Sequence, residues 1–115
     1  MEDKIEALKM ASEYIVNLKI SILKTVEYLQ SSEYEKGLNM LASIADGLNW
    51  LSIVIENTRD VQNGKISLSE LNNKLSEIVE AIEDKDNVLV GDLFQYELLP
   101  IIEKAEQIIN NSITN

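Results

Sequence analysis

The chain has 115 residues, of which 20 are acidic and 10 basic, and its net charge is −10. It contains neither cysteine nor histidine, which excludes disulfides, thiolate metal sites, thiol nucleophiles and imidazole catalysis. An acidic surface disfavours nucleic acid and anionic membranes but suits a basic protein partner. The acidic start, Met1 to Lys4, is unlike a signal peptide, and no apolar run approaches the roughly 18 residues that cross a bilayer. We therefore expect a cytoplasmic, single-domain protein that binds neither nucleic acid nor a membrane.

The first predicted helix covers residues 3–30. Apolar residues recur on it at heptad spacing, which indicates one buried face. The first core row is Leu8, Ile15, Ile22 and Leu29, and the second row is Ala11, Leu18 and Thr25.

The second predicted helix follows a break at Ser31-Ser32 and runs to about Asp60. Ser32 and Glu35 have the spacing of a capping box, in which each side chain bonds the backbone amide near the other. The expected core row of this helix is Leu38, Leu41, Ala45, Leu48, Ser52 and Ile55.

A loop is predicted at residues 61–66, where Asn63 and Gly64 both tolerate positive φ. Ser67 and Glu70 form a second potential capping box and begin the third helix, which ends near Asp84. The apolar stripe of the third helix is Leu68, Leu71, Leu75, Ile78 and Ile82.

The fourth predicted helix runs from about Asn87 to Asn111 and contains Pro100. Proline removes one amide donor and clashes with the preceding turn, so we expect a kink at Pro100 or two shorter helices. The expected core row is Phe94, Leu98, Ile101, Ala105 and Ile108.

The two halves of the chain align without a gap, so that Ile15 falls on Leu68 and Leu41 on Phe94. Two amphipathic hairpins with equal turns align in this way with or without an internal duplication. Both interpretations predict an all-α, antiparallel four-helix bundle in one domain, residues 1–115, with hairpins at 3–60 and 67–111 joined by the loop 61–66. Gly91 falls on Leu38, and we expect it to allow a close approach between helices.

A di-iron or di-manganese centre, the obvious catalytic site for a four-helix bundle, needs inward Glu-x-x-His pairs, which a chain without histidine lacks. Acidic residues gather instead around the turn between the third and fourth helices, and a metal-dependent enzyme using this turn is one alternative. The other interpretation is a solvated turn in which Asp86 or Asn87 caps the fourth helix. We expect no enzyme, cofactor or metal site. The acidic residues are Glu80, Glu83, Asp84, Asp86 and Asp92.

Apolar residues also lie outside the core rows of the first two helices. Monomers seldom expose such patches, and tryptophan is a frequent interface anchor, so we predict a protein-binding or homodimer face. The alternative is that both helices are buried more deeply or that residues 108–113 cover the patch. The predicted partner-binding residues are Trp50, Ile53, Val54, Val16, Ile20 and Leu23.

The segments Asp46–Leu51 and Val90–Pro100 resemble stretches of short uncharacterised proteins from low-GC Gram-positive bacteria. This resemblance implies a helical-bundle domain of unknown function and carries no catalytic residues. The chain is also loosely similar to flagellar export chaperones, small acidic helical proteins that mask an amphipathic client segment. The function expected from the sequence is therefore a bacterial interaction or adaptor module, or alternatively chaperone-like or antitoxin-like masking of a client helix or basic partner.

Overall fold

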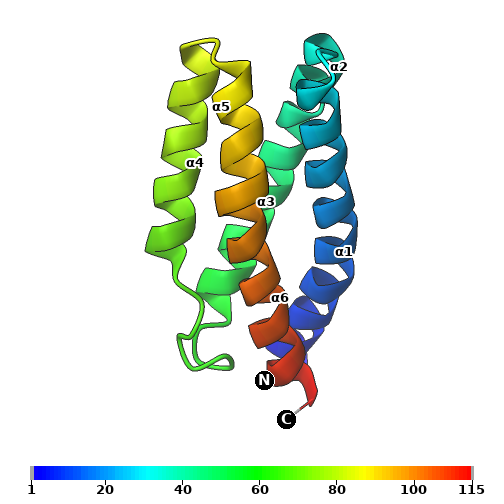
Figure 1. Ribbon diagram of the computed structural model, residues 1–115. Helices are drawn as coiled ribbons and strands as arrows, with labels where there is room; N and C mark the ends of the chain where they lie inside the picture. Colours follow the sequence, from blue (N-terminus) through cyan, green and yellow to red (C-terminus); the bar gives the residue numbers. More distant parts are fainter. Residues whose placement is uncertain (1, 115) are drawn as a thin grey trace.

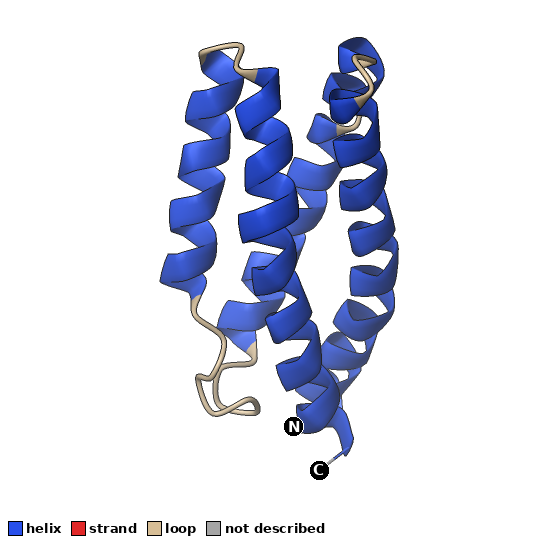
Figure 2. Ribbon diagram, in the orientation of Figure 1, coloured by secondary structure: helices blue, strands red, loops and turns tan. Residues whose placement is uncertain are grey.

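The computed structural model describes residues 2–114, and every regular element in that range is helical (Figure 2). The predicted all-α class is therefore confirmed. The first half of the chain forms α1 (Glu2–Gln30), α2 (Tyr34–Asn39) and α3 (Leu41–Asn57). The second half forms α4 (Leu68–Glu83), α5 (Asn87–Asp92), the π-helical segment η1 (Leu93–Leu98) and α6 (Leu99–Thr114).

The long elements form an elongated bundle of 45 × 22 × 19 Å (Figure 1). Both ends of the chain lie at one end of the bundle, with the loop that joins α3 to α4. The α1–α2 and α4–α5 turns lie at the other end. Packing is uneven, because α1 contacts α2, α3, α5, η1 and α6, whereas α4 rests mainly on α5 and η1 and barely touches α3. One side of the bundle is consequently open.

Helix α1 confirms both of its predicted core rows. All seven predicted residues are buried, including Thr25, whose hydroxyl donates to the Ser21 carbonyl oxygen at 2.9 Å. That bond satisfies the one polar group in the rows. An unbroken apolar face and the absence of Gly and Pro over these 29 residues explain the length of α1.

The predicted second helix is wrong in two respects. Ser32 does not cap it, because Ser32 has φ +65° and the capping residue is Glu33, which makes no side-chain cap bond. The helix is also divided at Met40 into α2 and α3. Gly37 lies within α2 and is buried against α1, where an added Cβ would come 2.8 Å from Leu29 Cδ2. Ser32 instead ends α1, because it takes the left-handed position after the helix and the Glu33 amide donates to the Tyr28 carbonyl oxygen at 2.8 Å.

The buried face of α3 also differs from the predicted row. Leu48 and Ile55 are buried as expected, but Leu38 and Ala45 are exposed, and Leu41 and Ser52 are half-buried. Helix α3 is rotated about its axis relative to the prediction, so that other residues are buried. These residues are Ile44, Gly47, Leu51 and Val54.

Helix α6 shows a related shift in register. Phe94, Leu98 and Ala105 are buried as predicted, but Ile102 and Ile109 are buried in place of Ile101 and Ile108, which are half-exposed. The wider turn of η1 adds one residue to the helical repeat. After it, the core positions predicted at Ile101 and Ile108 pass to the next residue, whereas Ala105 keeps its place. Pro100 is the second residue of α6, which begins directly after η1, and it has no amide to donate to the preceding turn. The expected kink at Pro100 stays a prediction.

Three local signals in the second half are confirmed. Asn63 and Gly64 have φ of +58° and +63°, as the turn prediction requires. The Ser67 hydroxyl accepts a hydrogen bond from the Glu70 amide at 3.2 Å and caps α4. At the start of α5 the Asp86 carboxylate accepts from the Leu89 amide at 3.1 Å. Asp86 is thus a helix cap, as one of the two sequence interpretations proposed.

The Lys4–Asp60 ion pair joins the start of α1 to the segment after α3, with Nζ 2.7 Å from Oδ2. The hydrogen bond from Lys4 holds the pKa of Asp60 below its ordinary value. A carboxylate with a lowered folded-state pKa contributes stability above its unfolded pKa of about 3.9, and this contribution is lost as the pH falls through the folded value. We expect the difference in unfolding free energy between wild type and Asp60→Asn to shrink as the pH falls below about 4. Urea titrations across this range test it, and a pH-independent difference would contradict it.

Candidate functional site

The six residues predicted to bind a partner do not form one surface. Val16, Ile20, Leu23 and Ile53 are exposed, with 50%, 59%, 48% and 51% of their surfaces accessible. Val54 is buried, so its assignment to an exposed face is wrong. The rotation of α3 that buries Val54 against the core is the physical reason. The α6 segment that includes residues 108–113 does not cover the exposed residues of α1 either.

Trp50 is half-buried and packs against the core. Its ring meets Tyr14 edge-on, with centroids 5.4 Å apart and planes at 76°. Tyr14 lies above Gly47, whose missing side chain leaves room for the phenol ring. Trp50 therefore helps to join α1 to α3. The alternative interpretation, in which the first two helices are buried more deeply than a regular bundle allows, thus holds in part for Trp50.

The exposed stripe on α1 is separated from Trp50 by polar residues. Glu13 and Asn17 line the shallow furrow between α1 and α3 beside Trp50. Their positions on the helical wheel place them between Trp50 and the stripe that contains Ile20. The sequence pattern did not reveal this separation, because it does not specify which side of α1 faces α3.

The open side of the bundle contains a longer apolar groove between α3 and α4, with a volume of about 270 Å³. It extends along α3 from Leu41 to Ser52 and along α4 from Asn72 to Ile82, about 15 Å on each helix. Phe94 closes its floor, where it is buried. The other lining residues are Ile44, Ala45, Leu48, Asn49, Leu75, Ile78 and Val79.

The sequence had assigned most of this groove to the closed core. Leu41, Ala45 and Leu75 belonged to the predicted core rows, yet they are only half-buried or exposed. Val79 was not assigned to any site, and 53% of its surface is accessible. The available signal was the surplus of apolar residues on several sides of α3, which one packing face cannot bury.

Charge is distributed unequally around the groove. None of the described residues that line it is charged, and Glu80 and Glu83 lie beside it on the outer surface of α4. On a different side of α4, Lys74 Nζ lies 2.9 Å from Glu97 Oε2 of η1 and 3.2 Å from Glu77 Oε2. The hydrogen bond to Glu97, followed by that to Glu77, raises the pKa of Lys74. This pair fastens α4 to η1 and leaves the groove rim acidic.

The acidic turn does not assemble into a metal centre. Within residues 2–114, no three acidic side chains converge in the geometry of a metal site. Asp86, which would have been central to such a site, is occupied as the cap of α5.

One stretch differs from the expectation that no segment is long and apolar enough to cross a membrane. The helical stretch Tyr34–Asn57 is long and apolar enough to cross a membrane, judged by length and composition alone. Its most apolar part has a mean hydropathy of 1.4, and 33% of that part is buried. A core helix of a soluble protein passes the same test, so this is a weak indicator. The low buried share fits the open groove wall on α3.

The fold and the groove define the class of this protein as a small helical-bundle domain with an open apolar groove. The model of a family described as a domain of unknown function, DUF8042, matches residues 6–108, and the chain therefore belongs to that family. The sequence-based expectation of a family of unknown function is thus confirmed. No curated protein and no solved structure shows significant similarity to the chain.

Proposed function

We propose that this domain is a non-enzymatic protein-binding module whose α3–α4 groove receives one face of a basic, amphipathic helix of a partner protein. The observation that carries the proposal is an apolar groove left open between two helices that barely touch. A helix in such a groove buries apolar side chains spaced at i, i+3, i+4 and i+7. The lack of histidine and cysteine in the chain is the reason for proposing a binding role over catalysis.

The dimensions favour a helix over a small molecule. A volume of about 270 Å³ lies just below the range of about 300–1,000 Å³ typical of small-molecule pockets. A length of about 15 Å corresponds to nearly three helical turns. The groove thus suits two or three large side chains that project from a helix lying across it.

Charge favours a basic partner over a second copy of the chain. The net charge of −10 makes two copies repel one another, while Glu80 and Glu83 next to the groove attract lysine or arginine flanking an apolar stripe. Masking of a client helix in the manner of a chaperone or antitoxin is one form of this activity. We propose that this binding takes place in the cytoplasm. We also propose that the two halves of the chain form antiparallel helical hairpins and that the protein is bacterial.

We expect a fluorescein-labelled helical peptide with leucines at i, i+3, i+4 and i+7 and lysines elsewhere to bind the protein with micromolar affinity. Val79→Glu, which places a charge in the groove, is expected to weaken binding at least about tenfold. Fluorescence anisotropy measures both affinities. Raising the salt concentration is expected to weaken the complex, because the peptide and the rim carry opposite charges.

Two matched variants show whether the groove is the surface involved. Val16→Glu changes the exposed α1 stripe and Val88→Glu an exposed position on α5, where 50% and 67% of the valine surfaces are accessible. Neither variant is expected to alter binding. If Val16→Glu abolished peptide binding while Val79→Glu left it unchanged, the binding site would be the exposed α1 stripe, and the groove proposal would be refuted. If solution mass measurement showed a wild-type dimer that Val79→Glu dissociates, the occupant of the groove would be a second copy of the chain and not a partner helix.

A further inference from the structure

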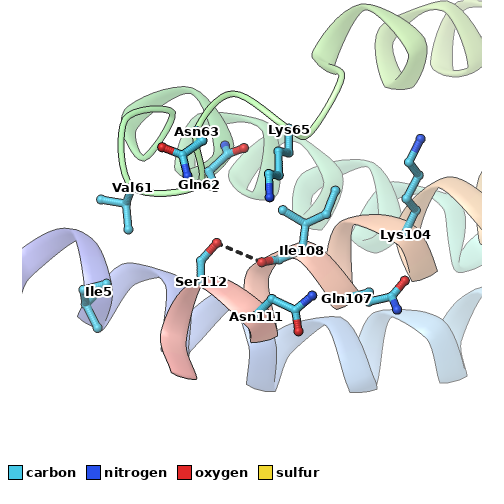
Figure 3. A pocket seen from close by; sticks show the side chains of 10 residues that line it. All are labelled: Ile5, Val61, Gln62, Asn63, Lys65, Lys104, Gln107, Ile108, Asn111 and Ser112. Carbon is cyan, nitrogen blue, oxygen red and sulfur yellow. Dashed lines mark hydrogen bonds between the residues drawn. The ribbon is translucent and has the colours of Figure 1, made fainter. Parts of the chain in front are cut away.

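A second hollow lies at the end of the bundle that holds both chain ends (Figure 3). It has a volume of about 410 Å³, within the usual range for small-molecule sites. The loop between α3 and α4 forms one wall and α6 the other, and Ile5 of α1 lies at one end. This pocket and the α3–α4 groove share none of their lining residues.

The lining of this pocket is unusual for so acidic a chain. Lys65 and Lys104 are its charged members, and no carboxylate is among the described residues that line it. Neither lysine belongs to an ion pair within residues 2–114. Glu70 shares a small neighbouring crevice with both lysines but forms no ion pair with either.

Uncharged hydrogen-bonding groups complete the polar part of the pocket. Asn63, Gln107 and Asn111 bring exposed side-chain amides to the lining. The Ser112 hydroxyl is occupied, since it donates to the Ile108 carbonyl oxygen at 2.8 Å. Two ammonium groups and several amide N–H donors suit an acceptor-rich anionic group.

The two lysines extend from the middle of the pocket, where Lys65 lies, to the end opposite Ile5 and Val61. Figure 3 shows Lys104 at one end of the α6 wall, with Ile5 and Val61 together at the other end. The stretch of α6 from Lys104 to Ser112 is about 12 Å long. A ligand with an anionic head and a short apolar tail would place each part beside matching residues.

The loop wall is held in place by its own buried side chain. Gln62 Nε2 donates to the Ile55 carbonyl oxygen at 3.0 Å, and its Oε1 accepts from the Ile66 amide at 3.1 Å. These bonds span the loop on both sides of Lys65. The loop is therefore presented to α6 as an ordered wall.

We propose that this pocket binds a small amphiphilic anion, with a carboxylate or phosphate head at Lys65 and Lys104 and a short alkyl tail at Ile5 and Val61. The site is independent of the partner groove, so the two proposals succeed or fail separately.

The test is a titration of the ¹⁵N-labelled full chain with hexyl phosphate and, separately, with hexanoate at constant ionic strength. We expect saturable shifts of the side-chain amide signals of Asn63, Gln107 and Asn111, with dissociation constants in the millimolar range. The relative affinities of the two ligands identify which head group is preferred. Inorganic phosphate and hexanol, which each lack one part of the ligand, are expected to bind at least about tenfold more weakly.

The double variant Lys65→Gln/Lys104→Gln is expected to weaken hexyl phosphate binding at least about tenfold. Lys9→Gln/Lys24→Gln makes the same change of net charge on α1, at two exposed lysines outside the pocket, and is expected to bind as wild type does. If both double variants bound hexyl phosphate equally weakly, the loss of affinity would come from the change in net charge and not from the pocket, and the proposal would be overturned. Absence of saturable shifts up to about 20 mM ligand, or equal affinity for hexanol, would also overturn it.

Discussion

Replacing Gly47 by alanine is expected to destabilise the protein, whereas the same replacement at Gly91 is expected to stabilise it. Alanine is favoured over glycine in a helix by about 1 kcal/mol, so both changes begin with the same gain. At Gly47 the added methyl group would overlap the Tyr14 hydroxyl and lie 2.7 Å from Cζ. Displacing the ring breaks its edge-on contact with Trp50, and we expect a net loss of about 1–3 kcal/mol.

The environment of Gly91 is different. A Cβ there would lie 3.7 Å from Leu29 Cβ, an ordinary van der Waals separation. Gly91 is buried against α1, but a methyl group also fits there, so this contact does not require glycine. Gly91→Ala should raise the unfolding free energy by about 0.5–1 kcal/mol, and thermal melts of the two variants should shift in opposite directions by several degrees.

A double-mutant cycle gives the control for Gly47. In a Tyr14→Ala background the overlap is gone, so Gly47→Ala should become stabilising by about 1 kcal/mol. Urea unfolding of the four proteins measures this reversal of sign. A Gly47→Ala effect that is the same with and without Tyr14 would show that the α1–α3 contact is not the cause.

Gln62→Ala is expected to lower the unfolding free energy by about 2–4 kcal/mol. Only 1% of the Gln62 surface is accessible, and its amide bonds both the end of α3 and the loop beyond it. Truncation leaves the Ile66 amide and the Ile55 carbonyl without this partner and opens a cavity. Chemical denaturation measures the loss.

Gln107→Ala provides the matched comparison. Gln107 is an exposed residue of α6 on the opposite wall of the same pocket, and its truncation should change stability by less than about 0.5 kcal/mol. Similar losses at the two positions would mean that the hydrogen bonds of Gln62 are not what orders the loop. Backbone spectra of Gln62→Ala should show changes concentrated between Thr58 and Ser67.

Several local features could be predicted from short stretches of sequence because their causes are local. The core rows of α1 follow from heptad spacing on a helix without breakers. Ser67 and Asp86 cap their helices by bonding an amide three residues ahead, and Asn63-Gly64 turns through positive φ. The prediction failed at Ser32 because this residue ends α1 in a left-handed conformation, with the Glu33 amide bonded to the Tyr28 carbonyl oxygen, and so cannot begin the next helix.

The candidate sites were harder to predict, because each depends on which surfaces meet. The stripes on α1 and α3 were assigned to one face, yet the structure separates them with Glu13 and Asn17. The α3–α4 groove was hidden among residues expected to close the core. The pocket at Lys65 and Lys104 joins positions far apart in the chain, and no spacing rule connects them.

The sequence by itself determined that this protein is an acidic, all-helical domain, since composition and apolar periodicity act within single helices. Tertiary structure decided how the helices face one another. Helix α3 is apolar on several sides, so periodicity could not identify its buried face. In the folded protein, the buried face is the one that contains Gly47, over which Tyr14 packs. Helix α4 packs on η1 and is fastened there by Lys74 and Glu97, which leaves its contact with α3 incomplete. The open groove results from that choice of neighbours, a property of the packed chain that no single segment contains.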